Sequence, residues 1–301
     1  MMPILSRSLQ AILLMLLAMA CLSSMNVFIR LLSPELASTQ MVLLRNIGSF
    51  ILILLWTSLI SGGKPRFATT RIRSHFWRAS VGIVAMELWF YSVTIMPLTL
   101  ATALSFTTPI FSTIFAMLFL GERVGVHRLS AIIAGFVGML VILRPDMGLV
   151  NPSAAIVLLS SGMMAIAGVL VKSLTRTEAP ETIVFYMSLF MIPWSIPLAL
   201  LHWQPLTVHH IALIAMVTVL STAAHLLMTR AYIRADMVIL MPVDFTRLIF
   251  TAILAYILFG ETLDTHTISG ALIIVASTVY IAHREAKKSA IRATTIDISS
   301  N

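Results

Sequence analysis

The chain has 301 residues, of which 59% are hydrophobic and 11% are charged. Soluble domains are about 45–50% apolar and about 25% charged, so no soluble core could bury these side chains and the lipid bilayer must be the solvent. A net charge of +8 can favour nucleic acid, but the basic residues lie in loops between apolar runs. That placement indicates orientation in a membrane and no nucleic-acid partner. The single cysteine, Cys21, excludes an internal disulfide.

Ten apolar runs follow one another along the chain, and each is long enough to span about 30 Å of hydrocarbon as an α-helix. They are residues 9–31, 37–59, 76–96, 98–119, 128–144, 152–172, 181–201, 209–233, 237–259 and 265–283. Ala18-Met-Ala20 faintly resembles a cleavage site, but its run continues to Leu32, which favours a membrane helix over a signal peptide. The sequence therefore predicts an all-α integral membrane protein with ten transmembrane helices. Residues 284–301 lose the pattern and are expected to form a disordered cytoplasmic tail.

A motif near the middle of the chain recurs near its end. The two copies are Phe119-Leu-Gly-Glu-Arg-Val-Gly-Val-His-Arg-Leu-Ser130 and Leu258-Phe-Gly-Glu-Thr-Leu-Asp-Thr-His-Thr-Ile-Ser269. They share Gly, Glu, His and Ser at one constant spacing, that between Gly121 and Gly260, which we call the repeat offset. A constant offset indicates internal duplication, which predicts two five-helix repeats, residues 9–144 and 152–283. Because five is odd, the repeats must be inverted relative to each other in the membrane. Glu122 and Glu261 fall at helix ends, where we expect caps or turn anchors.

The Lys and Arg residues are distributed unequally about the predicted helices. With the N-terminus inside, sixteen of the 20 lie in inner loops, at inner helix ends or in the tail, and Arg78 is counted among them. Arg30 and Arg144 lie outside, and Arg45 and Arg247 fall within helices. This bias predicts a multi-pass protein of a bacterial-type inner membrane with both termini in the cytoplasm.

Charged groups at mid-membrane are costly and mark functional sites. Glu87 and the titratable His225 are such residues, and their separation differs from the repeat offset by a single position. We therefore expect them to face one another across the axis that relates the repeats, where a carboxyl and an imidazole are a plausible proton pair. The alternative is a neutral Glu87 bonded to a hydroxyl group, with His225 as a packing residue.

Other intramembrane residues have two interpretations each. Asp244 and Arg247 share a helix face and form an internal ion pair, or Arg247 binds an anionic group of a substrate. Arg45 either reaches the outer surface or pairs with an acid. Trp89 and Tyr91 stack on a ring or cation in a cavity, or they pack against other helices and lipid.

We expect a polar cavity between the first, third, fourth, sixth, eighth and ninth helices. Glu87, Tyr91 and His225 should line it, and Asn26 joins them if its helix borders the cavity. The fifth and tenth helices carry almost no mid-membrane polarity, so they should lie outside, against lipid or a second subunit of a homodimer. His209-His210 is weak evidence for a metal. Without a nucleophile–base signature or a metal-binding helix motif, we expect neither a cofactor nor enzyme activity.

These features resemble the drug/metabolite transporter superfamily and, within it, the EamA family. The resemblance spans residues 9–283 and rests on Pro109…Phe-Leu-Gly-Glu122, Pro242-Val-Asp-Phe…Leu-Phe-Gly-Glu261, Arg45, Val27-Phe-Ile-Arg30 and Val169-Leu-Val-Lys172. It implies an inverted-repeat membrane carrier for small organic solutes, with a cavity between the halves. The chain shows no ATP-binding Gly-rich loop, so we expect transport to draw on gradients, by coupling to protons or to exchange. Members include amino-acid and metabolite exporters and uptake carriers for riboflavin or S-adenosylmethionine. A membrane enzyme or lipid-handling protein is the alternative, and neither substrate nor direction follows from the sequence.

Overall fold

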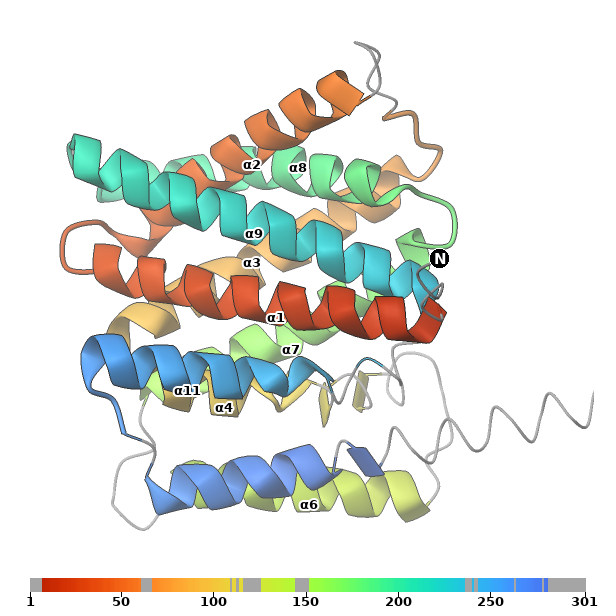
Figure 1. The fold of residues 1–301 in the computed structure, drawn as a ribbon, viewed down its shortest axis with the longest axis vertical. Coiled ribbons are helices and arrows are strands. Elements are labelled where there is room, and N and C mark those ends of the chain that lie inside the picture. The colour runs from red at the N-terminus through yellow and green to blue at the C-terminus, as the bar shows by residue number, and fades with distance from the viewer. Residues whose placement is uncertain are drawn as a thin grey trace, which may run out of the picture.

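The computed structural model describes residues 7–60, 67–108, 110–111, 114–115, 126–143, 152–235, 240, 243–262, 264–277 and 279–280. Regular structure in these ranges is helical throughout, which confirms the predicted all-α class. The helices with described bounds follow in the predicted order (Figure 1): α1 (Arg7–Leu32), α2 (Ser38–Ile60), α3 (Ile72–Ile95), α4 (Leu98–Ser105), α6 (Val126–Leu143), α7 (Pro152–Leu174), α8 (Pro180–Leu201), α9 (Val208–Arg234), α11 (Thr246–Phe259) and a last helix, Thr265–Ser277.

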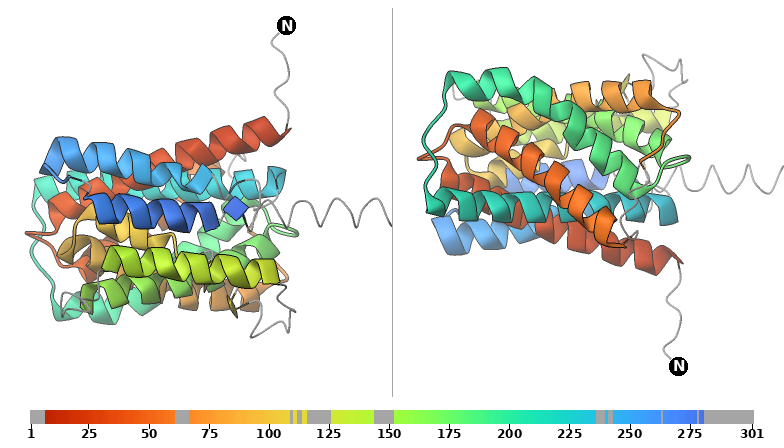
Figure 2. Two further views of the ribbon diagram at one scale, coloured as in Figure 1. Left: turned by 90° about the horizontal axis from the view of Figure 1, so that it is seen from below. Right: turned by 90° about the horizontal axis from the view of Figure 1, so that it is seen from above.

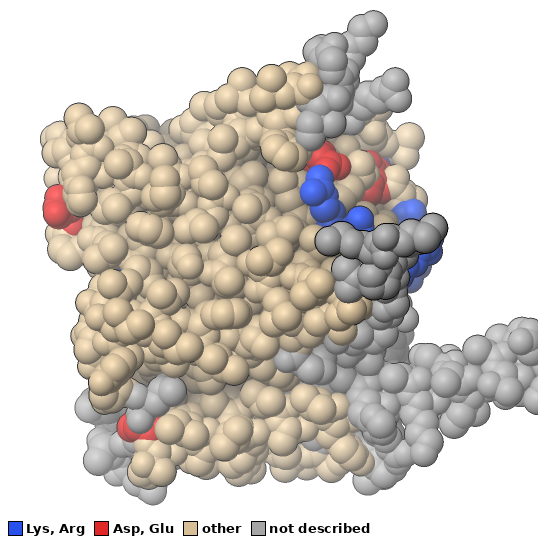
Figure 3. Space-filling model, in the orientation of Figure 1, with Lys and Arg blue, Asp and Glu red and all other residues tan. Residues whose placement is uncertain are grey.

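Five helices in the described ranges are long and apolar enough to cross a membrane. They are Leu9–Leu32, Ser38–Leu59, Ser153–Leu174, Pro180–Leu201 and Val208–Arg234. The helices of the bundle run broadly alongside one another, as the two turned views in Figure 2 also show. On the face seen in Figure 3, uncharged side chains form a broad band, and Lys and Arg gather at the end where the N-terminus lies. A multi-pass membrane protein has this distribution of charge.

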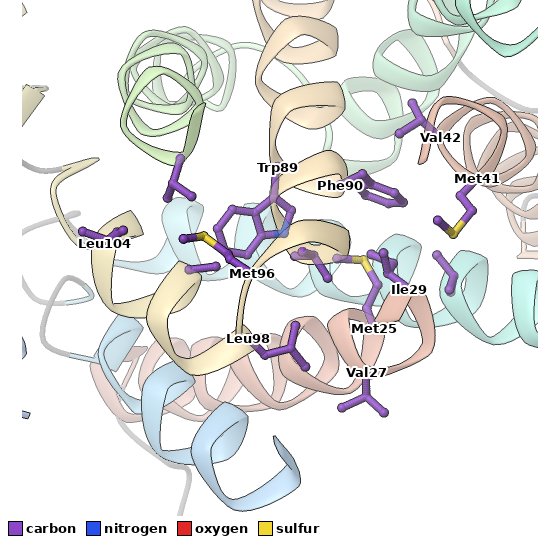
Figure 4. Close-up of a cluster of buried hydrophobic side chains, with 14 of the residues drawn as sticks. Met25, Val27, Ile29, Met41, Val42, Trp89, Phe90, Met96, Leu98 and Leu104 are labelled. Carbon is purple, nitrogen blue, oxygen red and sulfur yellow. The ribbon is translucent and has the colours of Figure 1, made fainter. Parts of the chain in front are cut away.

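The packing of the helices repeats between the two halves of the chain. α1 packs on α9 as α7 packs on α3, and α1 packs on α11 as α7 packs on α4. α2 and α8, which hold the same place in their halves, pack on each other. Trp89 and Phe90 project from α3 into the resulting core, among Met25 of α1, Met41 of α2 and Leu98 of α4 (Figure 4).

Two of the predicted helices are interrupted, and the interruptions lie at equivalent positions. α4 ends in a turn at Phe106, and α11 begins after a turn at Phe245, which matches Phe106 at the repeat offset. The two rings pack edge to face, with centroids 4.9 Å apart and planes at 84°. The expected continuous helices 98–119 and 237–259 are therefore wrong at these turns. Interrupted membrane helices at corresponding places in two halves are typical of a transporter binding site.

Basic side chains bind the C-terminal carbonyls of equivalent helices in the two halves. Arg30, at the end of α1, donates from Nη1 to the Val93 carbonyl of α3 at 2.8 Å. Lys172, at the end of α7, donates from Nζ to the Tyr232 carbonyl of α9, also at 2.8 Å. Val93 and Tyr232 again match at the repeat offset. The last carbonyls of a helix have no partner within it, so a basic group there satisfies them and stabilises the helix end.

The second copy of the duplicated motif ends α11 and caps α4. Gly260 follows α11 with φ at 66°, a left-handed conformation that glycine adopts without a steric penalty. The Glu261 carboxylate then accepts hydrogen bonds from the backbone N–H groups of Leu98 at 3.2 Å and Thr99 at 3.4 Å. The predicted cap is confirmed for Glu261, whereas Glu122 lies outside the described residues.

α6 and the last helix meet at glycines. A Cβ added to Gly270 would lie 2.5 Å from Ile142 Cγ1 and 2.6 Å from the Gly138 carbonyl oxygen. We expect Gly270→Ala to push the helices apart and to cost about 1–3 kcal/mol of stability, measured as a lower thermal unfolding midpoint in detergent. The matched control is Gly162→Ala in α7, where the added Cβ meets nothing closer than 3.8 Å. An unchanged midpoint for Gly270→Ala, or an equal loss in the control, contradicts this prediction.

Candidate functional site

A cavity of about 260 Å³ lies within the helix bundle. Its wall is built from α1, α2, α3, α7, α8, α9 and α11, together with Thr108, Leu240 and Asp244. Five of the six helices predicted to border a cavity therefore do so, and α2 and α8 join them. The predicted run 98–119 contributes Thr108, which lies beyond the end of α4. Among the described residues, none from α6 or from the last helix lines this cavity, so both lie outside it as predicted.

The two halves of the chain contribute matching positions to the cavity wall. At the repeat offset, the matching pairs are Met25 and Met164, Asn26 and Ala165, Arg45 and Val184, Met86 and His225, Trp89 and Met228, Phe90 and Thr229, and Thr108 and Arg247. Both members of each pair line the wall. The cavity therefore lies where the two halves meet.

Glu87 and Tyr91 are absent from the described wall, so the expectation that Glu87 faces His225 across the cavity is wrong. The repeat offset pairs His225 with Met86, one residue before Glu87. One residue turns a helix by about 100°, which takes Glu87 off the face of α3 that Met86 shares. Both carboxylate oxygens of Glu87 are buried without a hydrogen-bond partner among the described residues, so the alternative of a bond to a hydroxyl group is not observed either. Tyr91 is 46% exposed on the outside of the bundle.

Arg247 joins the two halves at the interrupted helices and is 8% exposed. Its Nη2 donates to Ser105 Oγ at 2.7 Å and lies 4.0 Å from Asp244 Oδ2. Its guanidinium carbon lies 5.6 Å from the ring centroid of Phe106 and 5.8 Å from that of Trp89, within the range of a cation–π contact. The Asp244–Arg247 ion pair, one of the two interpretations of these residues, is therefore present and balances the charge of Arg247.

Asn26 and Trp89 form a second link across the wall. The Trp89 indole Nε1 donates to Asn26 Oδ1 at 3.1 Å, and both residues are buried. A buried indole N–H needs such a partner, so the bond fixes the ring of α3 against α1. Both residues line the cavity, as expected.

Two further guanidinium groups line the wall without an acidic partner in the described ranges. Arg45 is 1% exposed, so it does not reach the outer surface, and it donates to Ser221 Oγ and Asn46 Oδ1 at 2.8 Å each. Arg78 is 6% exposed. Nη2 of Arg45 and both Nε and Nη1 of Arg78 have no hydrogen-bond partner among the described residues.

Arg78 is the charged wall residue that the sequence reasoning missed. Its helix was expected to begin at residue 76, which left Arg78 with the inner positive charges, whereas α3 begins at Ile72. Arg78, Gly82 and Met86 are spaced four residues apart, and all three line the cavity. That spacing places them on one helix face and was the signal available in the sequence.

Comparison with known proteins agrees with this architecture. A sequence profile of the EamA-like transporter family matches residues 9–144 and 151–282. The S-adenosylmethionine uptake transporter of Rickettsia bellii is 29% identical, over 90% of this chain and 93% of its own. The riboflavin transporter of Rhizobium johnstonii is 30% identical, over 74% of this chain and 76% of its own. A solved crystal structure shares the fold with a TM-score of 0.63 and 13% identity, over 90% of this chain and 96% of that chain.

These relatives are named as transporters and not as enzymes. The profile match covers both halves of the chain, and the structure supplies apolar helices of membrane-spanning length. The chain therefore belongs to the EamA-like transporter family and is a multi-pass membrane protein.

Proposed function

We propose that this protein is a secondary active transporter for a small organic metabolite, and that it works in the inner membrane by alternating access between two inverted five-helix repeats. The cavity carries this proposal, because matching positions of the two halves build its wall. A site at the interface of two repeats is the one that rocking of the repeats exposes to each side in turn. S-adenosylmethionine and riboflavin, after which the relatives are named, are the first metabolites to test.

The helix ends support opposite orientation of the proposed repeats, residues 9–144 and 152–283. The loop after α1 lies at the left end of the bundle in Figure 1, and the loop after its counterpart α7 lies at the right end. Arg30 and Lys172, which bind equivalent carbonyls, therefore belong to opposite ends of the bundle. Opposite placement of matching helix ends is the pattern of an inverted repeat.

Two reporter fusions test the proposed orientation. Sixteen of the 20 Lys and Arg residues belong to the inner set, so we expect a fusion after Arg284 and one within residues 61–66 to report the cytoplasm. A fusion within residues 33–37, between α1 and α2, should report the periplasm and serves as the opposite control. A periplasmic signal at either of the first two sites contradicts the ten-helix topology.

We propose coupling to protons or to exchange, with Glu87 as the candidate proton carrier. Its carboxylate oxygens are buried without a described partner, and ionising such a group within a membrane is costly. Glu87→Gln keeps the shape but cannot ionise. It should insert normally, abolish accumulation driven by a pH gradient and retain exchange of labelled for unlabelled metabolite. Asp244→Asn, on the wall, is the comparison and should weaken both modes. Accumulation at the wild-type level in Glu87→Gln assigns Glu87 a structural role.

The outer face of α6 is apolar, with Ile133 56% and Phe136 54% exposed. Lipid covers such a face in a monomer, and a second copy of the chain covers it in a homodimer. A cysteine introduced at Phe136 in a Cys21→Ser background distinguishes the two, because it forms an intermolecular cross-link only in the homodimer.

Alternating access itself is tested with one cysteine in the cavity. Gly168 of α7 lines the wall, and a Cβ added there meets no atom within 4 Å. A membrane-impermeant thiol reagent should therefore label Gly168→Cys, in the Cys21→Ser background, in both right-side-out and inside-out vesicles. A saturating transported metabolite should slow labelling from both sides. Labelling from one side alone, in every condition, contradicts the proposal.

A further inference from the structure

The cavity wall carries more positive than negative charge. Arg45, Arg78 and Arg247 line it, and Asp244 is the acidic residue among the described lining residues. Asp244 balances Arg247. The buried oxygens of Glu87 bond to none of these arginines. The excess positive charge is therefore that of Arg45 and Arg78.

Arg45 and Arg78 line the same cavity wall, and both are more than nine-tenths buried. His225 lies on the same wall. A buried charge is strongly destabilising unless an opposite charge approaches it. An anionic group between these two side chains would reduce the cost of their burial.

The donors of these two arginines are arranged to receive such a group. Arg45 is held by Ser221 and Asn46, which leaves its Nη2 without a described partner. Nε and Nη1 of Arg78 are also buried without a described hydrogen-bond partner. Each of these buried N–H groups can donate a charge-assisted hydrogen bond to a carboxylate oxygen, and a side chain already held in place loses less entropy when it binds.

The rest of the wall suits an apolar body of variable shape. Seven methionines line the cavity, from α1, α3, α7, α8 and α9, and Trp89 and Phe90 supply rings. Methionine is flexible and polarisable, so a methionine-rich wall adapts to different ligands. Fixed charged donors beside an adaptable apolar wall are the usual composition of a small-molecule site.

We propose that Arg45 and Arg78 form a carboxylate-binding subsite, and that the transported metabolite is an organic acid whose apolar body lies against the methionine-rich wall. This inference rests on the proposed transport function and names its substrate class. Arg247, already paired with Asp244 and Ser105, is assigned to holding the interrupted helices rather than to this subsite.

The test uses ligands matched in shape and different in charge. Purified protein in detergent is titrated with indole-3-acetate, indole-3-acetamide and tryptamine, and with nicotinate, nicotinamide and 3-aminomethylpyridine, while the thermal unfolding midpoint is followed. A ligand that binds the native state raises this midpoint. We expect the acids to bind at least about 10-fold more tightly than the amides, as the loss of a charge-assisted hydrogen bond implies. Preference for the amides or amines, or stabilisation by neither acid, overturns the subsite.

Variants assign the effect to the two arginines. Arg45→Gln and Arg78→Gln should each weaken acid binding about 10- to 100-fold and leave amide binding unchanged. Arg45→Lys and Arg78→Lys keep the charge and should retain the preference for acids, which covers the case in which a Gln variant does not fold. The control is Arg71→Gln, which removes an arginine that binds the Ser173 carbonyl away from the wall. Unchanged acid binding in the folded Gln variants overturns the assignment. A carrier that binds only amides or amines leaves the proposed transport function intact.

Discussion

Gly168→Phe is expected to reduce transport to the level of empty vesicles without unfolding the protein. Gly168 lines the cavity from α7, and a Cβ at this position meets no atom within 4 Å. The ring can therefore extend into the roughly 260 Å³ cavity without distorting the helix, and it fills the space that a metabolite needs. Transport is measured in proteoliposomes and folding as the thermal unfolding midpoint in detergent.

A graded series controls for the substitution itself. Gly168→Ala adds one methyl group to the same open space and should retain most of the transport. Gly162→Phe, on α7 but not among the described wall residues, should affect stability more than transport, because Phe115 and Phe111 lie 3.8–3.9 Å from the position of its Cβ. Full transport by a folded Gly168→Phe protein would mean that the metabolite takes another route.

Arg247→Met is expected to destabilise the protein by roughly 1–3 kcal/mol. The substitution leaves the Asp244 carboxylate without a counter-charge and the Ser105 hydroxyl without its donor. The Asp244 side chain is 31% exposed, and solvent therefore keeps this effect below that of a fully buried pair. The measurement is the free energy of unfolding, or the thermal midpoint where unfolding is irreversible.

A double variant separates the lost charge pair from lost packing. Arg247→Met combined with Asp244→Asn should recover part of the stability that Arg247→Met alone loses, because no unpaired carboxylate remains. Residues in contact show such non-additive effects, on the order of 0.5–3 kcal/mol. If the stability lost in the double variant equals the sum of the losses in the two single variants, the ion pair is not a stabilising contact.

Hydropathy and the repeat offset predicted the fold well because both are long-range properties of the chain. Each of the ten apolar runs contains a helix among the described residues, in the same order, since membrane helices must be apolar over about 20 residues. The turns at Phe106 and Phe245 were missed because apolar residues on both sides give no change in hydropathy there. Once one turn is known, however, the repeat offset gives the position of the other.

The site was predicted less accurately because it depends on single residues. The sequence predicted that His225, Asn26 and, in one interpretation, Trp89 line a cavity, and the structure brings them to its wall. Arg45, Asp244 and Arg247 were singled out as intramembrane residues, and they line the same wall. The pairing of Glu87 with His225 failed through a shift of one residue. On a helix, such a shift changes the direction of a side chain by about 100°.

The most direct test is solute counterflow by the purified protein in proteoliposomes. Vesicles are loaded with an unlabelled metabolite, S-adenosylmethionine, riboflavin or an organic acid that binds the purified protein, and diluted into a trace of its labelled form. A carrier with an alternating cavity gives a transient, saturable accumulation of label for at least one of these metabolites, and Gly168→Phe abolishes it. Absence of counterflow for all of them with folded wild-type protein, or counterflow that persists in Gly168→Phe, would contradict transport through this cavity.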